Sequence, residues 1–215
     1  MHFHIITLFP KAFDSYLGES ILKRAIEDKK IKVSFYNPRD FTKDKWKRID
    51  RPPYAGGPGM VIQAEPVIKA IQRAKGLRSK VKIIFLTPSG KQFTNSYAAS
   101  VAKKYKDVII VSGRYEGIDA RVKKVFKTDE VSIGPFVLTG GELPAQLIID
   151  TISRHVPGVL GNLGSIEESR TASPDVYTRP ESFKYKGKAY AVPKVLLSGN
   201  HAKIEEWKSK RKTDK

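Results

Sequence analysis

Apolar and polar residues follow two alternating patterns along the first 155 positions. Short runs rich in Ile, Val and Phe, each soon followed by Pro, Gly or Ser, predict buried parallel strands at 4–9, 32–36, 81–86 and 108–111. Apolar residues at helical spacing predict helices at 12–27, 65–74, 95–105 and 143–155. Alternating strands and helices of this kind predict an α/β fold, with a parallel sheet layered with helices.

The remaining sequence predicts a linker and a second, smaller domain. Residues 161–174 are mostly small or polar, and a basic helix is expected around 204–212, after Ser198-Gly199-Asn200. We therefore expect a first domain at 1–160, a linker at 161–175 and a mostly helical C-terminal domain at 176–215.

Two glycine-containing segments carry the strongest functional signal. Both segments, residues 112–119 (SGRYEGID) and 132–144 (SIGPFVLTGGELP), follow apolar runs. Glycine permits positive φ and close approach of a ligand to the backbone, so the pair predicts a pocket walled by main chain. Two ordinary tight turns of an α/β protein are the alternative, because neither segment matches the dinucleotide fingerprint or the phosphate-binding loop.

Charge and composition favour a nucleic-acid partner. The 215 residues carry a formal net charge of +18, and no acidic residue occurs between Lys75 and Lys106. Such a charge attracts polyanions, and aromatic residues among the lysines suit RNA phosphates and unstacked bases. The absence of a long apolar run or a leader pattern predicts no membrane contact and a cytoplasmic protein. Without cysteines, and with four scattered histidines, no metal site is predicted.

Several motifs together resemble one enzyme family. Besides the two glycine-containing segments, they are 55–60 (AGGPGM), 86–90 (LTPSG), Arg154 with 157–161 (PGVLG), 177–180 (YTRP) and 195–201 (VLLSGNH). In this order they resemble the bacterial tRNA (guanine-N1)-methyltransferase family, TrmD, of the SPOUT superfamily. The resemblance implies an α/β SPOUT fold with a deep trefoil knot. It also implies S-adenosylmethionine as methyl donor and tRNA with guanosine at position 37 as substrate.

The resemblance also assigns residues to the cofactor. It implies that three loops and the turn after them bind S-adenosylmethionine: Leu86, Thr87, Pro88, Ser89 and Gly90; Gly113, Arg114, Tyr115, Glu116 and Gly117; Ile133, Gly134, Pro135, Phe136, Val137 and Leu138; and Gly140, Gly141 and Pro144. Glycines and short apolar side chains suit an adenine slot with backbone donors and acceptors. Pro135 stands where the family usually has an acidic residue, which removes one N–H donor.

Methyl transfer to guanine N1 needs a base, because this nitrogen is protonated at neutral pH. By the resemblance, Glu168 is the base, Arg154 neutralises charge developing on O6, and Glu116 holds guanine or the adjoining loop. The linker is shorter than in the family, so Glu167 and Asp175 remain rival bases. Arg154 alternatively satisfies the end of its own helix.

The resemblance implies a homodimer whose active site spans both chains, and a magnesium requirement whose site no ligand cluster identifies. Two alternatives stay open within the same likeness: a ribose 2′-O-methyltransferase of the superfamily, or a tRNA-binding homologue with impaired catalysis. A basic ribosomal structural domain is a third alternative.

Overall fold

The computed structural model describes residues 1–54, 56–161 and 175–210. Backbone contacts divide the chain into two compact units, Met1–Asn162 and Leu163–Lys215. Each unit is described by itself.

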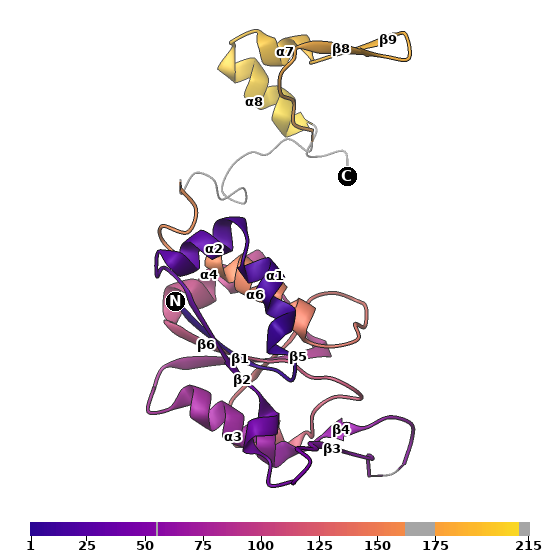
Figure 1. Cartoon of the computed structure of the whole chain (residues 1–215). Helices are drawn as coiled ribbons and strands as arrows, with labels where there is room; N and C mark the ends of the chain where they lie inside the picture. The colour runs from indigo at the N-terminus through magenta and orange to yellow at the C-terminus, as the bar shows by residue number, and fades with distance from the viewer. Residues whose placement is uncertain (55, 162–174, 211–215) are drawn as a thin grey trace. The chain divides into compact units, whose positions relative to one another are not determined.

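The first unit is built on a five-stranded parallel sheet (Figure 1). Its strands, in spatial order, are β2 (Lys32–Tyr36), β1 (His2–Ile6), β6 (Asp107–Val111), β5 (Val81–Gln92) and β7 (Asp129–Ser132). In the register of the central strands, Phe3 lies opposite Val33 on β2 and Val108 on β6. A parallel sheet is covered on both faces, which accounts for the nearly continuous apolar runs of β5 and β6.

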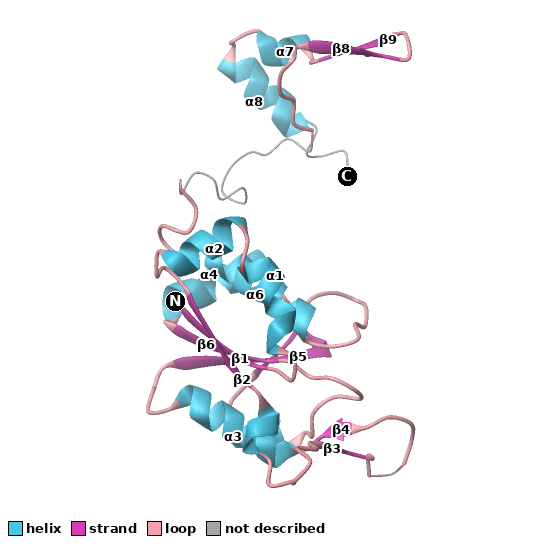
Figure 2. Ribbon diagram, viewed as in Figure 1, coloured by secondary structure: helices cyan, strands magenta, loops and turns pink. Residues whose placement is uncertain are grey.

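Helices cover both faces of this sheet (Figure 2). One face packs against α1 (Asp14–Leu17), α2 (Ser20–Glu27), α4 (Asn95–Lys104) and α6 (Glu142–Ser153), and the other against α3 (Ala64–Lys75) and α5 (Arg121–Val125). Successive strand residues point to opposite faces, so Ile110 joins the first core and Ile109 the second. The predicted α/β fold with a parallel sheet is confirmed.

Elements that differ from the predictions include a strand that ends early, a helix that is divided in two, and a strand that was not predicted. β1 ends at Ile6, and the chain enters a 3₁₀ turn at Pro10–Phe13. The single helix predicted at 12–27 is two helices, because the chain breaks at Gly18 and Ser20 takes a positive φ of 51°. β7 was not predicted, since Val131 is its only strongly apolar residue.

A small hairpin of the first unit lies beside the first glycine-containing segment. It consists of β3 (Asp50–Arg51) and β4 (Val61–Ile62), with a glycine-containing loop between them. The Ile62 N–H donates to Gly117 O at 3.0 Å, and the Asp119 N–H donates to Ile62 O at 2.9 Å. These bonds place the hairpin beside residues 112–119.

The second unit contains an antiparallel hairpin and two helices. The elements are β8 (Ser182–Tyr185), β9 (Lys188–Ala191), α7 (Lys194–Leu197) and α8 (His201–Lys210). Asn200 caps the start of α8, because its side chain accepts a hydrogen bond from the Lys203 N–H at 3.1 Å. The expected basic helix is present, whereas the hairpin had no counterpart in the sequence prediction.

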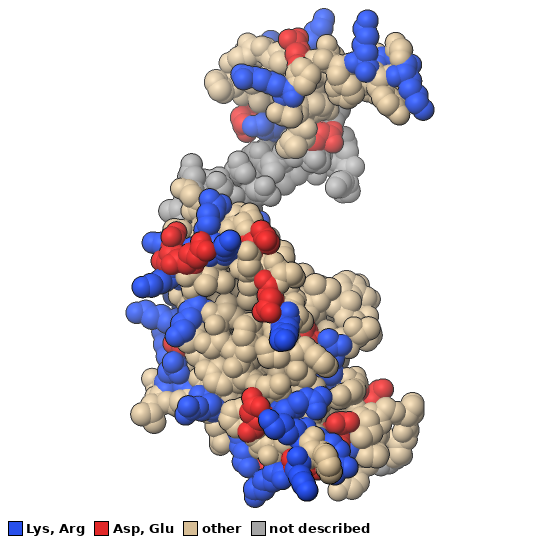
Figure 3. All heavy atoms as spheres, viewed as in Figure 1, with Lys and Arg blue, Asp and Glu red and all other residues tan. Residues whose placement is uncertain are grey.

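Lysine and arginine side chains are spread along the first unit and on the hairpin of the second, with acidic groups among them on the first (Figure 3). In the part of the chain that the structure describes, no helix has the length and apolar character needed to cross a bilayer.

Candidate active site

A cavity of about 360 Å³ lies where residues 86–88, 113–118 and 131–141 converge. This volume falls within the range of small-molecule sites, roughly 300–1,000 Å³. The walls come from the middle of β5, from the segment after β6 and from the segment after β7. Main chain and apolar side chains make up much of the wall.

The first loop is a bulge within β5. The pairing of β5 with β7 shifts between Leu86 and Lys91, and residues 87–90 lie inside this shift. At Gly90 an added Cβ would lie 2.5 Å from the Val131 nitrogen, closer than real Cβ contacts. Glycine is therefore required there by the neighbouring strand, and it leaves Leu86, Thr87 and Pro88 at the cavity.

The second loop, residues 113–117, is joined to the start of α6 by a partly buried charge pair. Arg114 Nε donates to Glu142 Oε2 at 2.8 Å, and Thr7 Oγ1 donates to Glu142 Oε1 at 2.8 Å. The Glu142 residue is only 3% exposed. The Arg114 guanidinium also lies over the Phe9 ring, 4.7 Å from its centroid. Three segments distant in sequence are thus held together beside the cavity.

Glu116 belongs to the second loop and lies against the glycine-containing loop of the hairpin. Its N–H donates to Met60 O at 3.0 Å. A Cβ on Gly59, whose φ is +84°, would lie 2.6 Å from Glu116 Oε1, so the absence of a side chain at Gly59 makes room for the carboxylate. Among the described residues, none forms a hydrogen bond with the Glu116 side chain, which leaves its carboxylate available at the cavity wall.

The turn that follows the third loop, at Gly140 and Gly141, crosses closely over the segment that contains the second loop. The Gly141 N–H donates to Gly113 O at 2.9 Å, and a Cβ on Gly141 would lie 2.7 Å from Ser112 Cα. Phe136 and Val137 are 52% and 79% exposed and stand at the cavity. The two glycine-containing segments are therefore neighbours in space and form one pocket.

Most residues assigned to the cofactor by the resemblance line this cavity. They are Leu86, Thr87, Pro88, Gly113, Arg114, Tyr115, Glu116, Gly117, Ile133, Phe136, Val137, Leu138, Gly140, Gly141 and Pro144. Ser89, Gly90, Gly134 and Pro135 lie outside the lining. Gly90 packs on β7, Ser89 bonds to Thr87, and the Gly134 N–H bonds to Ser132 Oγ.

Sequence reasoning missed seven other lining residues, and it missed the Thr7 and Glu142 side chains that join the loops through Arg114. The additional lining residues are Phe85, Ile118, Ala120, Lys123, Val131, Ser132 and Thr139. A glutamate after Gly-Gly has the pattern of an ordinary helix-start acid, and only the fold shows that it is buried beside Arg114.

Of the three residues that the resemblance assigns to catalysis, only Glu116 is found at this pocket among the described residues. Arg154 ends α6, whereas Glu142 at the other end of the helix borders the pocket loops. Twelve helical residues span about 18 Å, so Arg154 is far from the cavity of its own chain. Glu168 and Glu167 lie outside the described residues, and Asp175 is exposed in the second unit.

An exposed face of α6 and its neighbours carries apolar side chains. Leu143 and Leu147, one helical turn apart, are 61% and 40% exposed, and Phe9 is 44% exposed. Tyr16 on α1 donates to Asp150 on α6, and this hydrogen bond raises the pKa of the phenol. We refer to Phe9, Tyr16, Leu143 and Leu147 as the α6 apolar face.

Comparison with known proteins decides the family. The family model described as tRNA (Guanine-1)-methyltransferase TrmD matches residues 1–215. The chain belongs to the TrmD family. Among its curated relatives, the tRNA (guanine-N(1)-)-methyltransferase of Clostridioides difficile (strain 630) is 46% identical over 215 residues, covering 97% of this chain and 90% of the relative.

Other TrmD relatives have a similar identity to this chain and are covered to a similar extent. The protein of the same name from Geobacter sulfurreducens is 46% identical, covering 98% of this chain and 86% of its own. That from Buchnera aphidicola subsp. Acyrthosiphon pisum is 43% identical over 213 residues, covering 97% of this chain and 88% of its own. The similarity thus extends over both units, including the segments that form the cavity.

Proposed function

We propose that this TrmD-family chain methylates N1 of guanosine at position 37 of tRNA, with S-adenosylmethionine as the methyl donor. The observation that carries the proposal is the convergence of three distant segments on one main-chain-walled cavity. Relatives named as tRNA (guanine-N(1)-)-methyltransferases give the reaction, and the net charge of +18 suits an RNA substrate.

The residues present fit the methyl donor. Glycine at 113, 140 and 141 brings backbone groups to the cavity, and Leu86, Ile133 and Phe136 supply apolar walls for adenine. When bound, S-adenosylmethionine supplies a methyl carbon on a positively charged sulfur, so attack by a nitrogen breaks only that carbon–sulfur bond. Arg114 serves this site by joining its loops to Glu142.

The chain's part in the chemistry is to position guanine and accept its N1 proton. We assign proton removal to the Glu168 carboxylate, with Glu167 or Asp175 as the alternatives within the same proposal. Arg154 would offset the negative charge that develops on O6 as N1 loses its proton. Glu116, available at the cavity wall, would hold the guanine edge or the adjoining loop.

The separation of Arg154 from the cavity supports an active site shared between two chains. One helix places Arg154 about 18 Å from the pocket end of α6, too far for one guanine to reach both. The α6 apolar face lies along this helix and is suited to cover by a second copy. We therefore propose a homodimer in which one chain binds the donor and its partner offers Arg154 and the linker carboxylate.

The close crossing of the second and third loops supports a knotted SPOUT path as part of the same proposal. The domain division at 1–160, 161–175 and 176–215, a cytoplasmic location and a magnesium requirement also belong to it. Magnesium prefers oxygen ligands and keeps several of its waters. RNA phosphates together with one carboxylate, such as that of Glu116, would therefore be enough to bind the ion.

In the second unit, the hairpin offers a surface suited to RNA. Phe183 and Tyr190 stack with centroids 5.5 Å apart and an interplanar angle of 14°, and both are exposed. Lys186 and Lys188 lie beside hairpin tyrosines, 5.5 Å and 5.6 Å from the ring centroids. Exposed rings and lysines together favour contact with unpaired bases and phosphates.

The proposal is tested with a tRNA transcript bearing guanosines at 36 and 37, labelled donor, and a matched transcript with adenosine at 37. We expect label only in the first transcript, and a primer-extension stop at position 37. Arg154→Ala and Glu168→Gln should each lose more than about tenfold in rate, since positioned proton transfer contributes roughly 10²–10⁴.

The same assay separates the alternatives. Label without a primer-extension stop would indicate ribose methylation, and tRNA binding without label would indicate an inactive homologue. An unimpaired Glu168→Gln variant would move the base to Glu167 or Asp175.

A further inference from the structure

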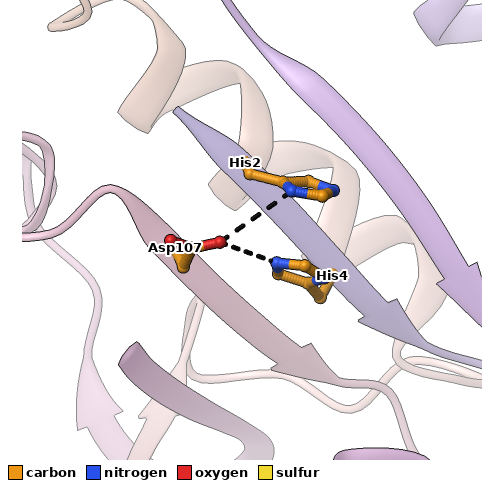
Figure 4. Close-up of side chains that lie close together, drawn as sticks. All are labelled: His2, His4 and Asp107. Carbon is orange, nitrogen blue, oxygen red and sulfur yellow. Dashed lines mark hydrogen bonds and ion pairs between the residues drawn. The ribbon is translucent and has the colours of Figure 1, made fainter. Parts of the chain in front are cut away.

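Three potential metal ligands meet at the amino ends of the central strands (Figure 4). His2 and His4 are two residues apart on β1 and therefore project from the same face. Asp107 begins β6 and pairs in register with His2. Asp107 Oδ1 lies 3.0 Å from His4 Nε2 and 3.8 Å from His2 Nδ1, so both rings present one nitrogen to the same oxygen.

The second nitrogen of each imidazole is held by a hydroxyl group on β2. His2 Nε2 lies 2.9 Å from Ser34 Oγ, and His4 Nδ1 lies 3.2 Å from Tyr36 Oη. In the structure, His4 Nε2 donates a hydrogen bond to Asp107 Oδ1 at 3.0 Å. With an ion bound, the hydroxyls would accept hydrogen bonds from the outer ring N–H groups, and the nitrogens facing Asp107 would carry lone pairs. Metal-binding histidines have this arrangement, in which an outer hydrogen bond fixes the ring and its tautomer.

The two imidazoles differ in exposure. His4 is fully buried, and the His2 side chain is 20% exposed. Burial lowers the pKa of His2 to about 4, with smaller contributions from His4, Lys32 and Arg78, although Asp107 opposes the shift. Burial also lowers the pKa of His4, and Asp107 again opposes the shift.

We propose that His2, His4 and Asp107 form a binding site for a divalent transition-metal ion of the Zn²⁺ type. Ligand atoms at about 2.0–2.1 Å from a tetrahedral zinc lie roughly 3.3 Å apart, and the observed 3.0 Å and 3.8 Å lie on either side of this spacing. Two imidazoles and one carboxylate suit zinc, nickel or copper better than magnesium. The partly exposed side of His2 and Asp107 leaves a position for water.

Arg78 is the main opponent of a bound cation. Its Nε forms an ion pair with the same Asp107 Oδ1, at 2.9 Å, while its Nη1 donates to Ala74 O and Lys75 O at the end of α3. A metal ion and Arg78 therefore compete for one carboxylate. Removing the guanidinium should strengthen metal binding. If the cluster is only a hydrogen-bonded network, the same change creates no affinity for metal.

The site is separate from the cavity and independent of the proposed function. His2 and Asp107 begin their strands, whereas the cavity loops follow the carboxyl end of β6. A bound ion would join β1 to β6 and hold the first residues of the chain on the sheet. Its measurable effect is therefore on stability, and methyl transfer provides no test of it.

The experiment uses the full chain without a histidine tag, stripped of metal, titrated with Zn²⁺ by calorimetry and with Co²⁺ by visible absorption. We expect one ion per chain, a tetrahedral Co²⁺ spectrum, and a Tm rise of about 5–10 °C at 100-fold excess over Kd. His2→Ala and Asp107→Asn should weaken binding at least tenfold, and Ser34→Ala by about tenfold. His201→Ala, on the exposed start of α8, is the control and should bind as wild type.

Arg78→Gln makes the test independent of whether a ligand variant folds well. We expect it to bind Zn²⁺ at least tenfold more tightly than wild type. The proposal is overturned if wild type and Arg78→Gln both fail to bind one ion. It is overturned equally if His2→Ala, folded by circular dichroism, binds as tightly as wild type.

Discussion

Replacing Glu142 should destabilise the loops of the candidate active site, although this side chain does not line the cavity. In Glu142→Ala, the Thr7 hydroxyl, in a residue 1% exposed, loses its acceptor, and Arg114 loses its carboxylate partner. Breaking a buried charge pair costs about 3–5 kcal/mol, and the 29% exposure of the Arg114 side chain places the cost toward the lower end. The unpaired hydroxyl adds about 1 kcal/mol or more.

At about 2–4 °C per kcal/mol for a chain of this size, a cost of about 4–5 kcal/mol in Glu142→Ala should lower Tm by about 8–20 °C. Glu142→Gln keeps the shape and one acceptor and should fall between this variant and wild type. The matched control is Glu65→Gln, which removes an exposed charge from its pair with Lys69 on α3 and should leave Tm unchanged.

The assay is thermal unfolding followed by circular dichroism, together with calorimetric titration of S-adenosylmethionine into each variant below its Tm. Donor affinity should fall in both Glu142 variants and stay at the wild-type value in Glu65→Gln, because only Glu142 joins Arg114 and the second loop to α6. A Glu142→Ala protein with the Tm and donor affinity of the control would refute this reasoning.

Four further changes test other parts of the structure. Gly141→Ala places a Cβ 2.7 Å from backbone of the second loop and should cost about 1–3 kcal/mol in urea unfolding, whereas Gly161→Ala, with open space around it, should be neutral. Ile148 is a fully buried residue of α6, and Ile148→Ala should cost about 2–5 kcal/mol by the same measurement. Leu143→Glu should shift sedimentation from dimer to monomer without lowering secondary structure, and an unchanged dimer would contradict the assigned interface. Lys188→Ala should weaken tRNA binding and reduce the slope of log K against log salt by about 0.7, which a salt series checks.

The sequence predicted best those elements whose burial produces a local pattern of apolar residues. The apolar runs of β5 and β6 and the spacing of α3 and α4 reflect cover on both faces of the sheet, so their positions could be read directly. β7 and the β8–β9 hairpin could not, because Asp129 and the alternating lysines give no apolar run.

The candidate site was predictable only in part. The glycines predicted a pocket walled by main chain, because two backbone segments can approach each other closely only where side chains are absent. The hydrogen bond from the Gly141 N–H to Gly113 O is such a close approach. The join between Thr7, Arg114 and Glu142 could not be foreseen, because those residues meet only after the sheet has formed. The same holds for the approach of Asp107 to His2 and His4, because Asp107 lies 103 residues after His4 along the chain.

A crystal structure of this protein with S-adenosylmethionine is the most direct test of the central claim, that three converging segments hold the methyl donor. The account predicts the adenosyl group inside the cavity, against main chain of residues 113–117 and 133–141 and the side chain of Leu86. Donor bound elsewhere, or a cavity that stays closed while the protein is saturated with donor, would contradict it.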